Sequence, residues 1–292
     1  RETVMMLVRI CRHWRYSLFV LLWLLSLVFS LPVYASNLSA SDDKRTVLVG
    51  FSQDTLANDW RLAQVHAVQK GLEPYEHIRF LYTDGKGSTA KQIQDIENLI
   101  SRGVDILITS PRDSRAMLPV IEQAHNQGIA VILLTRKIDN GAFTTFIAPD
   151  DAAIARDAAR YIAERLDSKG NVLVLQGVPS ASTAIIRTNA FINELEKYPD
   201  LRIVAVKSAN YLRSDAIQAV EEVLLQGINF DAIYAQSDSM ASGARIALSN
   251  SGTDLKKKLI VGIDYISEAQ EAIRNGVQSA SFTYPLCANE AV

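Results

Sequence analysis

Cysteine and histidine are scarce in this chain, and their scarcity removes whole classes of chemistry. The 292 residues include two cysteines, of which Cys287 alone follows residue 35. A region with one cysteine cannot form an internal disulfide, so its stability must come from a packed core. The four histidines are scattered and lack the spacing of metal ligands. We therefore expect neither a metal nor another cofactor.

The chain also lacks an excess of positive charge and the common signatures of enzymes. Its formal net charge is −2, and residues 1–35 hold four of the 30 basic residues, so the remainder is mildly acidic. Such a protein has no general electrostatic attraction to nucleic acid, and we expect no nucleic-acid partner. The segment at 85–88 is too short for a phosphate-binding loop, and no nucleophile elbow is present. These absences argue against an enzyme.

Long apolar runs are missing except for one near the start of the chain. Arg9, Arg12 and Arg15 precede an apolar block at 18–31, and the small-residue segment 33–35 follows it. This order is typical of a secretory signal peptide, here residues 1–35, and we expect it to be cleaved. A retained membrane anchor is the alternative, but the block is shorter than the ~20 residues that span a bilayer. A repressor would instead carry a DNA-binding headpiece at this place.

From residue 46 onward, short apolar runs alternate with longer amphipathic stretches. We predict strands at 46–50, 78–82, 106–108 and 131–134, and helices at 59–70, 89–102 and 114–126. Strands that are apolar throughout, each followed by a helix, are typical of a parallel sheet that is covered on both faces. The right-handed crossovers of such units produce a doubly wound α/β layer.

The same pattern repeats in the second half of the chain. We predict further strands at 145–148, 172–175, 202–206, 232–235, 259–263 and 279–282, and helices at 151–166, 183–197, 214–226, 240–249 and 267–275. The two series of strands and helices each have the length of an ordinary domain, so we predict two doubly wound parallel-sheet domains, at 44–148 and 149–284. A leader at 36–44 precedes them.

The chain stops soon after the last predicted strand. Tyr284-Pro285 is predicted to begin a helix, and we expect residues 285–292 to return to the first domain. A helix of about seven residues is marginal alone, which suggests that the C-terminus is truncated.

Polar and aromatic side chains gather directly after the predicted strands. Ligands of open α/β sheets bind beyond the carboxyl ends of the strands, so these are the candidate binding positions. The residues found there include Ser52, Gln53, Asp54, Trp60, Arg61, Arg112, Thr135, Arg136, Gln176, Tyr211, Arg213, Gln236, Ser237, Asp238 and Asp264. Aromatic faces and charged hydrogen-bonding groups suit a hydroxyl-rich ligand. Simpler roles stay open: Arg136 as a solvated cation, Asp238 and Asp264 as helix caps, and Trp60 as a packed aromatic.

Six segments carry a family resemblance. They are residues 49–53, Trp60-Arg61, 103–105, Gln176-Gly177, 234–244 and 261–264. Together they resemble the type I periplasmic sugar-binding proteins of bacterial ABC importers, above all the ribose-, galactose- and galactofuranose-binding members. The resemblance covers about residues 46–292 and implies a periplasmic protein with two domains, a hinge and a ligand cleft between them. It implies a sugar-like ligand and a membrane ABC permease as partners. A sensory protein of the same fold, which presents its ligand to a membrane receptor or kinase, is the alternative.

The resemblance also suggests roles for individual residues. Trp60 and Arg61 match an aromatic–arginine pair of the family, and Arg136 matches an arginine that follows strand four. Tyr211 matches an aromatic residue that stacks on the sugar, and Asp264 matches a carboxylate at a strand end. Ser237 matches a position that is often asparagine, and Asp238 lies beside it. Arg187 lies in the segment that supplies a further arginine, although Ile185 also fits that position.

Thr135 departs from the family pattern. It stands where the family has an aspartate before the arginine at 136. Threonine offers one donor and is a weaker acceptor than an ionised carboxylate. Its presence predicts less negative charge around Arg61, Arg136 and Arg187. The sequence thus predicts either a differently hydroxylated sugar or a ligand that carries a carboxylate or phosphate.

Overall fold

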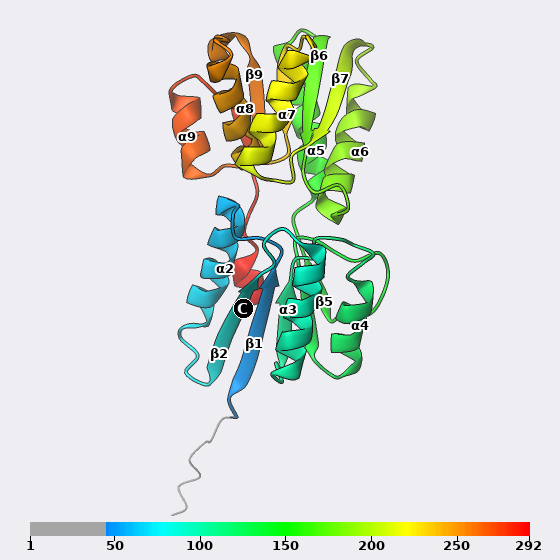
Figure 1. Ribbon diagram of the computed structural model, residues 1–292, viewed down its shortest axis with the longest axis vertical. Coiled ribbons are helices and arrows are strands. Elements are labelled where there is room, and N and C mark those ends of the chain that lie inside the picture. Colours follow the sequence, from blue (N-terminus) through cyan, green and yellow to red (C-terminus); the bar gives the residue numbers. More distant parts are fainter. Residues whose placement is uncertain (1–44) are drawn as a thin grey trace, which may run out of the picture. The chain divides into compact units, whose positions relative to one another are not determined.

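The computed structural model describes residues 45–292, which fold as two parallel-sheet α/β domains (Figure 1). The predicted signal peptide at 1–35 and the predicted leader at 36–44 fall outside the described residues, as does the start of the first predicted domain at residue 44. Within residues 45–292, no helix combines the length and the apolar character that a bilayer crossing requires.

The first domain is built on a five-stranded sheet in the order β2-β1-β3-β4-β5. Its strands are β1 (Val47–Gln53), β2 (Ile78–Asp84), β3 (Ile106–Thr109), β4 (Ala130–Leu134) and β5 (Thr145–Ile147), and its helices are α2 (Asp59–Leu72), α3 (Thr89–Ser101) and α4 (Leu118–Asn126). All neighbouring strands are parallel, and Phe51 of β1 pairs with both Tyr82 and Ile108. The carboxyl ends of these strands therefore share one edge.

The second domain repeats this arrangement in a five-stranded sheet of order β10-β9-β8-β6-β7. Its strands are β6 (Lys169–Gln176), β7 (Asp200–Ser208), β8 (Ala232–Ala235), β9 (Leu259–Asp264) and β10 (Ala280–Thr283). Its helices are α5 (Asp151–Arg165), α6 (Ser182–Leu195), α7 (Arg213–Leu225), α8 (Asp238–Asn250), the 3-10 helix η1 (Leu255–Lys257) and α9 (Ser267–Arg274). The prediction of two doubly wound parallel sheets is confirmed.

Each sheet has a hydrophobic core on both faces, as the continuously apolar strands predict. In β8, Ile233 and Ala235 join the core that α7 and α8 cover, whereas Ala232 and Tyr234 join the core that α5 and α6 cover. Successive side chains of a strand point to opposite faces, so both sets must be apolar when both faces are covered.

Helix caps explain why two helices begin close to strand ends. The Asn58 side chain accepts a hydrogen bond from the Arg61 backbone N–H at 3.0 Å and caps α2. The Ser237 hydroxyl accepts one from Met240 N at 3.3 Å and caps α8. A cap satisfies an N–H that has no partner within the helix. Trp60, Arg61 and Asp238 are thereby fixed in first turns of helices that follow the carboxyl ends of strands.

Two helix predictions are wrong at their starts. The helix predicted from Ser114 begins at Leu118, because the carboxylate of Asp113 accepts hydrogen bonds from Arg115 N and Ala116 N and forms a turn there. The helix predicted from Tyr284-Pro285 is the short α10 (Ala288–Ala291). The left-handed backbone of Cys287, with φ of 54°, interrupts a helix before that point.

Two connections link the domains, at 148–150 between β5 and α5 and at 284–287 between β10 and α10 (Figure 1). After the second one, Cys287 and Ala288 join the core around Val49 and Phe51 of the first sheet.

Candidate functional site

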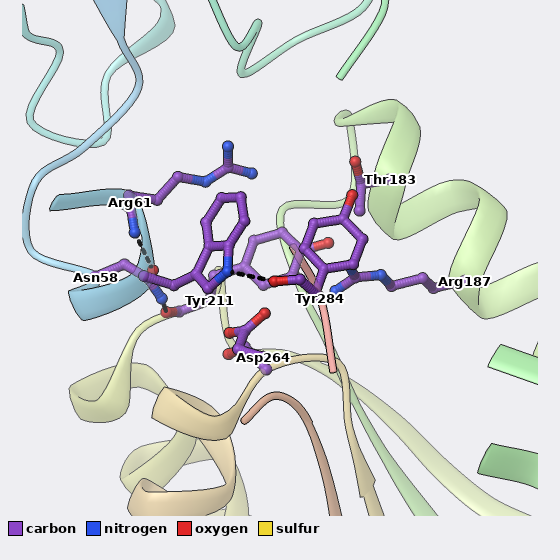
Figure 2. Close-up of a pocket in the computed structure, with 9 residues that line it drawn as sticks. Asn58, Arg61, Thr183, Arg187, Tyr211, Asp264 and Tyr284 are labelled. Carbon is purple, nitrogen blue, oxygen red and sulfur yellow. Dashed lines mark hydrogen bonds between the residues drawn. The ribbon is translucent and has the colours of Figure 1, made fainter. Parts of the chain in front are cut away.

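A small cavity lies between the first turn of α2 and the carboxyl ends of the second sheet. It has a volume of about 20 Å³ and is lined by Asn58, Trp60, Arg61, Thr183, Arg187, Tyr211, Ser237, Asp264 and Tyr284. Figure 2 shows Arg61, Arg187 and Asp264 approaching the aromatic side chains from three sides. A cavity of this size holds about one water molecule, so a larger ligand enters only when the walls move apart.

Six of the candidate residues named from the sequence line this cavity. They are Trp60, Arg61, Arg187, Tyr211, Ser237 and Asp264. Five other candidates, Ser52, Gln53, Thr135, Arg136 and Asp238, are buried and do not line it.

Arg136 is a buried cation and not a solvated one. Its side chain is fully buried, and its guanidinium carbon lies 5.2 Å from the centre of the Tyr211 ring. Arg136 therefore does not line the cavity itself but contacts Tyr211, which does. Such a contact between a cation and an aromatic face is attractive.

Asp54, at the end of β1, is the partner of Arg136. Its Oδ2 accepts a hydrogen bond from Arg136 Nη1 at 2.7 Å, and its carboxylate lies 3.8 Å from Arg61 Nε and 3.7 Å from Arg112 Nη1. Burial alone would raise the pKa of Asp54, but Arg136 and Arg61 outweigh it and hold this pKa below its ordinary value. Asp54 is therefore an ionised, buried carboxylate among three arginines.

The predicted shortage of negative charge caused by Thr135 is wrong. Asp54 supplies a carboxylate to Arg136 and Arg61 from a different strand. The Thr135 hydroxyl accepts a hydrogen bond from Arg61 Nη1 at 3.1 Å, and the same nitrogen donates to Ser110 Oγ at 2.6 Å. Burial, together with the nearby Arg136, lowers the pKa of Arg61 to about 10, which leaves it charged at neutral pH.

Arg187 forms the corresponding ion pair in the second domain. Its Nε donates to Asp151 Oδ1 at 2.8 Å and its Nη1 donates to the Gln236 carbonyl at 2.6 Å. Burial alone would lower the pKa of Arg187, but the charge of Asp151 holds this pKa well above its ordinary value. Two groups fix the guanidinium, and its remaining edge faces the cavity that it lines.

Aromatic rings form much of the cavity wall. The Trp60 indole N–H donates to the Tyr284 carbonyl at 3.0 Å, and the two rings are 5.3 Å apart between centres. Trp60 also belongs to the hydrophobic core of the second domain, so it is both a packed aromatic and a cavity residue. Rings of this kind present flat apolar faces to the C–H groups of a ligand.

Neither Asp238 nor Asp264 caps a helix. Ser237 caps α8, and the residue before α9 is Ile266. Asp238 Oδ2 accepts from Ser281 Oγ at 2.6 Å, and its Oδ1 accepts from Gln278 Nε2 at 2.9 Å. Asp264 has a positive φ of 112° and lines the cavity, and burial raises its pKa well above the ordinary value. Strained backbone of this kind is common at binding sites.

The buried Asp238 carboxyl should make stability depend on pH. Burial raises its pKa to about 6, so between pH 4 and pH 6 the folded state holds a proton that the unfolded state releases. This contribution to the unfolding free energy should fall by about 3 kcal/mol as pH rises from 4 to 7. We expect the difference between the unfolding free energies of the wild type and Asp238→Asn (wild type minus variant), measured by urea unfolding, to decrease from pH 4 to pH 7. The matched control Asp157→Asn, at an exposed aspartate, should give a flat difference, and a flat difference for Asp238→Asn would contradict the assignment.

Several buried polar atoms beside the cavity have no partner within the described chain. They include Arg136 Nε and Nη2, Asp54 Oδ1, and the hydroxyls of Tyr211 and Tyr234. Buried polar atoms without partners are costly, and in native proteins a ligand or ordered water usually satisfies them. The cluster therefore combines donors and acceptors in the way that a polyhydroxyl ligand would require.

Four important residues were not among the candidates named from the sequence. Asn58, Thr183 and Tyr284 line the cavity, and Asp151 holds Arg187. Asp54, which follows a strand directly, was a candidate for contact with the ligand, but it pairs with Arg136. Asn58 and Thr183 lie near helix starts, whereas no sequence signal separated Tyr284 from a helix start.

Comparisons with known proteins agree with this architecture. A family model described as a periplasmic binding protein domain matches residues 49–285. The ribose import binding protein of Bacillus subtilis is 30% identical over 243 residues, which is 83% of this chain and 78% of that protein. The galactofuranose-binding protein of Escherichia coli is 27% identical, over 80% of this chain and 76% of its own length.

Solved structures show the same likeness. The crystal structure of a galactofuranose binding protein has a TM-score of 0.80 at 27% identity and covers 84% of this chain and 86% of its own. The fructose-binding periplasmic domain of a hybrid two-component system has a TM-score of 0.80 at 29% identity, with coverages of 84% and 82%. The match is to a family of binding proteins and not of enzymes. The chain belongs to the periplasmic binding protein family.

Proposed function

We propose that this protein captures a neutral sugar or a similar polyol between its two domains and delivers it to a membrane ABC importer. The observation that carries the proposal is the balance of charge at the cavity. Arg136 is paired with Asp54 and Arg187 with Asp151, while Arg61 and Asp264 both line the cavity. Arg61 Nε also lies 3.8 Å from the Asp54 carboxylate, so each of these three arginines already has a carboxylate beside it.

This balance favours a neutral ligand over the sugar acid or phosphate that Thr135 suggested. An anionic ligand would need a cation that is not already neutralised by a carboxylate. A hydroxyl, in contrast, donates to a carboxylate and accepts from a guanidinium at once, so it suits a site in which both stand side by side.

The ligands named for the relatives support the same class. The relatives include a xylitol-binding protein of Mycolicibacterium smegmatis and solved proteins bound to arabinofuranose and to fucofuranose. All of these are neutral and rich in hydroxyl groups, as are ribose and galactofuranose.

Calorimetry and thermal unfolding with a ligand panel test the proposal. The panel contains D-ribose, D-allose, D-fructose, L-arabinose, D-galactose, xylitol and myo-inositol, with D-galacturonate and ribose 5-phosphate as anionic counterparts. At least one neutral member should bind, and at 100 times its dissociation constant it should add about 2.7 kcal/mol to the unfolding free energy. Binding of the anions alone would overturn the neutral-ligand assignment. Binding of no member would overturn the proposed function.

A substitution of Arg61 connects the ligand to this cavity. Arg61→Met removes a charged donor from the wall and should weaken binding about tenfold to a hundredfold, since such a hydrogen bond contributes about 1.5–3 kcal/mol. Arg45→Met is the control, because Arg45 is exposed at the start of the first domain. Equal binding by the two variants would place the ligand elsewhere.

A sensory role is the second candidate function. The structural match to the fructose-binding domain of a hybrid two-component system supports it. Transport assays with reconstituted permease distinguish the two roles, because a sensor would bind the sugar without stimulating uptake.

The proposal extends to export and to domain motion. We infer that residues 1–35 are a cleaved signal peptide, which mass determination of the exported protein would test. We also infer domains at 44–148 and 149–284, with residues 285–292 returning to the first. The connections at 148–150 and 284–287 would then act as hinges when the domains close on a ligand.

A further inference from the structure

Tyr284 occupies an unusual place between the two domains. It directly follows β10, in the second connection between the domains, and it is 5% exposed. Its neighbours come from both sides: Trp60 belongs to α2 of the first domain, whereas Arg187 and Asp151 belong to the second. Figure 2 shows its ring beside Arg187 at the cavity.

Four contacts fix the orientation of the Tyr284 ring. The backbone carbonyl accepts the Trp60 indole N–H at 3.0 Å, and the Trp60 ring packs against the tyrosine ring. On the other side, the Arg187 guanidinium carbon lies 4.3 Å from the ring centre, and the hydroxyl donates to Asp151 Oδ2 at 3.4 Å. A ring held on both sides by packed groups has little freedom to rotate away.

The ring also takes up the space next to the groups that would bind a sugar. Trp60, Arg187 and Tyr284 together line a cavity of about 20 Å³. Tyr284 lies on the connection between the domains and contacts a residue of each, so its ring stands where the two walls of the cavity meet.

We propose that Tyr284 limits the size of the ligand. Its ring packs against both Trp60 and Arg187 and closes the gap between these two lining residues, so the site takes a compact, unsubstituted sugar ring and excludes its glycosides. This inference rests on the proposed function, because it concerns the selectivity of the same cavity.

The test compares parent sugars with their methyl glycosides. Dissociation constants are measured by calorimetry for D-ribose, L-arabinose and D-galactose and for the methyl glycoside of each. In the wild-type protein the methyl glycoside of the bound sugar should bind at least tenfold more weakly than its parent. Tyr284→Ala should reduce this ratio to threefold or less. Tyr284→Phe keeps the ring and should keep the wild-type ratio, although it loses the contact with Asp151.

Matched variants separate selectivity from folding. Tyr265→Ala removes a tyrosine that is 44% exposed and lies outside the cavity lining, so its ratio should equal that of the wild type. Tyr284→Leu provides a second shortened side chain if the alanine variant does not fold. If the shortened variants bind the parent sugar and keep the wild-type ratio of glycoside to parent dissociation constants, the size limit is overturned but the proposed function stands. Failure of every sugar to bind the wild type overturns both.

Discussion

Replacing Arg187 with methionine is expected to weaken sugar binding about a hundredfold. The substitution removes the guanidinium that lines the cavity, that supports the Tyr284 ring and that pairs with Asp151. A charged hydrogen bond to a ligand contributes about 1.5–3 kcal/mol, which corresponds to about one to two powers of ten in the dissociation constant. Calorimetry with the bound sugar measures the change.

The same substitution should also destabilise the free protein. It leaves the Asp151 carboxylate buried without its cation, and loss of one partner of a buried ion pair costs about 3–5 kcal/mol. The double variant Arg187→Met with Asp151→Leu removes both charges, so it should recover much of this stability. It should not recover binding, because the donor is still missing. Recovery of both would show that Arg187 acts only on folding.

A surface ion pair provides the matched control. Arg115 bonds to Asp139 at 3.1 Å, both side chains are exposed, and exposed pairs contribute about 0–1 kcal/mol. Arg115→Met should therefore change neither binding nor stability by a comparable amount. An Arg187→Met variant that behaves like this control would contradict the site.

The fold could be predicted from local sequence because its signals are local. Each strand is continuously apolar, and helix ends carry their own markers, such as Gly103 with its φ of 73°. The parallel strand order followed from the alternation of strands and helices, and positions at strand ends then pointed to Arg61 and Asp264, whereas Arg187 was indicated only by the family resemblance. These inferences need no knowledge of distant contacts.

The pairing of charges could not be predicted in this way. Asp54 and Arg136 are 82 residues apart, and only the strand order β1-β3-β4 brings their strand ends together. The sequence showed a carboxylate missing at Thr135, but not that Asp54 at the end of β1, two strands away in the sheet, supplies another. Tyr284 was missed for a related reason: a connecting segment between domains has no periodicity that separates it from a helix start.

Replacing Asp54 with asparagine should reduce the unfolding free energy by about 3–5 kcal/mol at neutral pH. The side chain keeps its shape, but Arg136 loses its buried counter-charge, and Arg136 Nε and Nη2 already lack partners within the described chain. Urea unfolding measures the loss. The exposed control Asp157→Asn should lose less than about 1 kcal/mol. A double variant with Arg136→Met should lose less than the sum of the two single variants, because the two substitutions remove one shared interaction.

The effect of Asp54→Asn should disappear in acid. The folded-state pKa of Asp54 is lowered by its arginines, so its contribution is complete above the ordinary aspartate value of about 3.9 and is lost as pH falls through the lower folded value. Asp238 has the opposite sign, since its pKa is raised to about 6 and its favourable contribution is lost as pH rises. The two variants should therefore deviate from the wild type in opposite directions across the acid range. Parallel pH profiles for Asp54→Asn and Asp238→Asn would mean that Asp54 is not held ionised by the arginines around it.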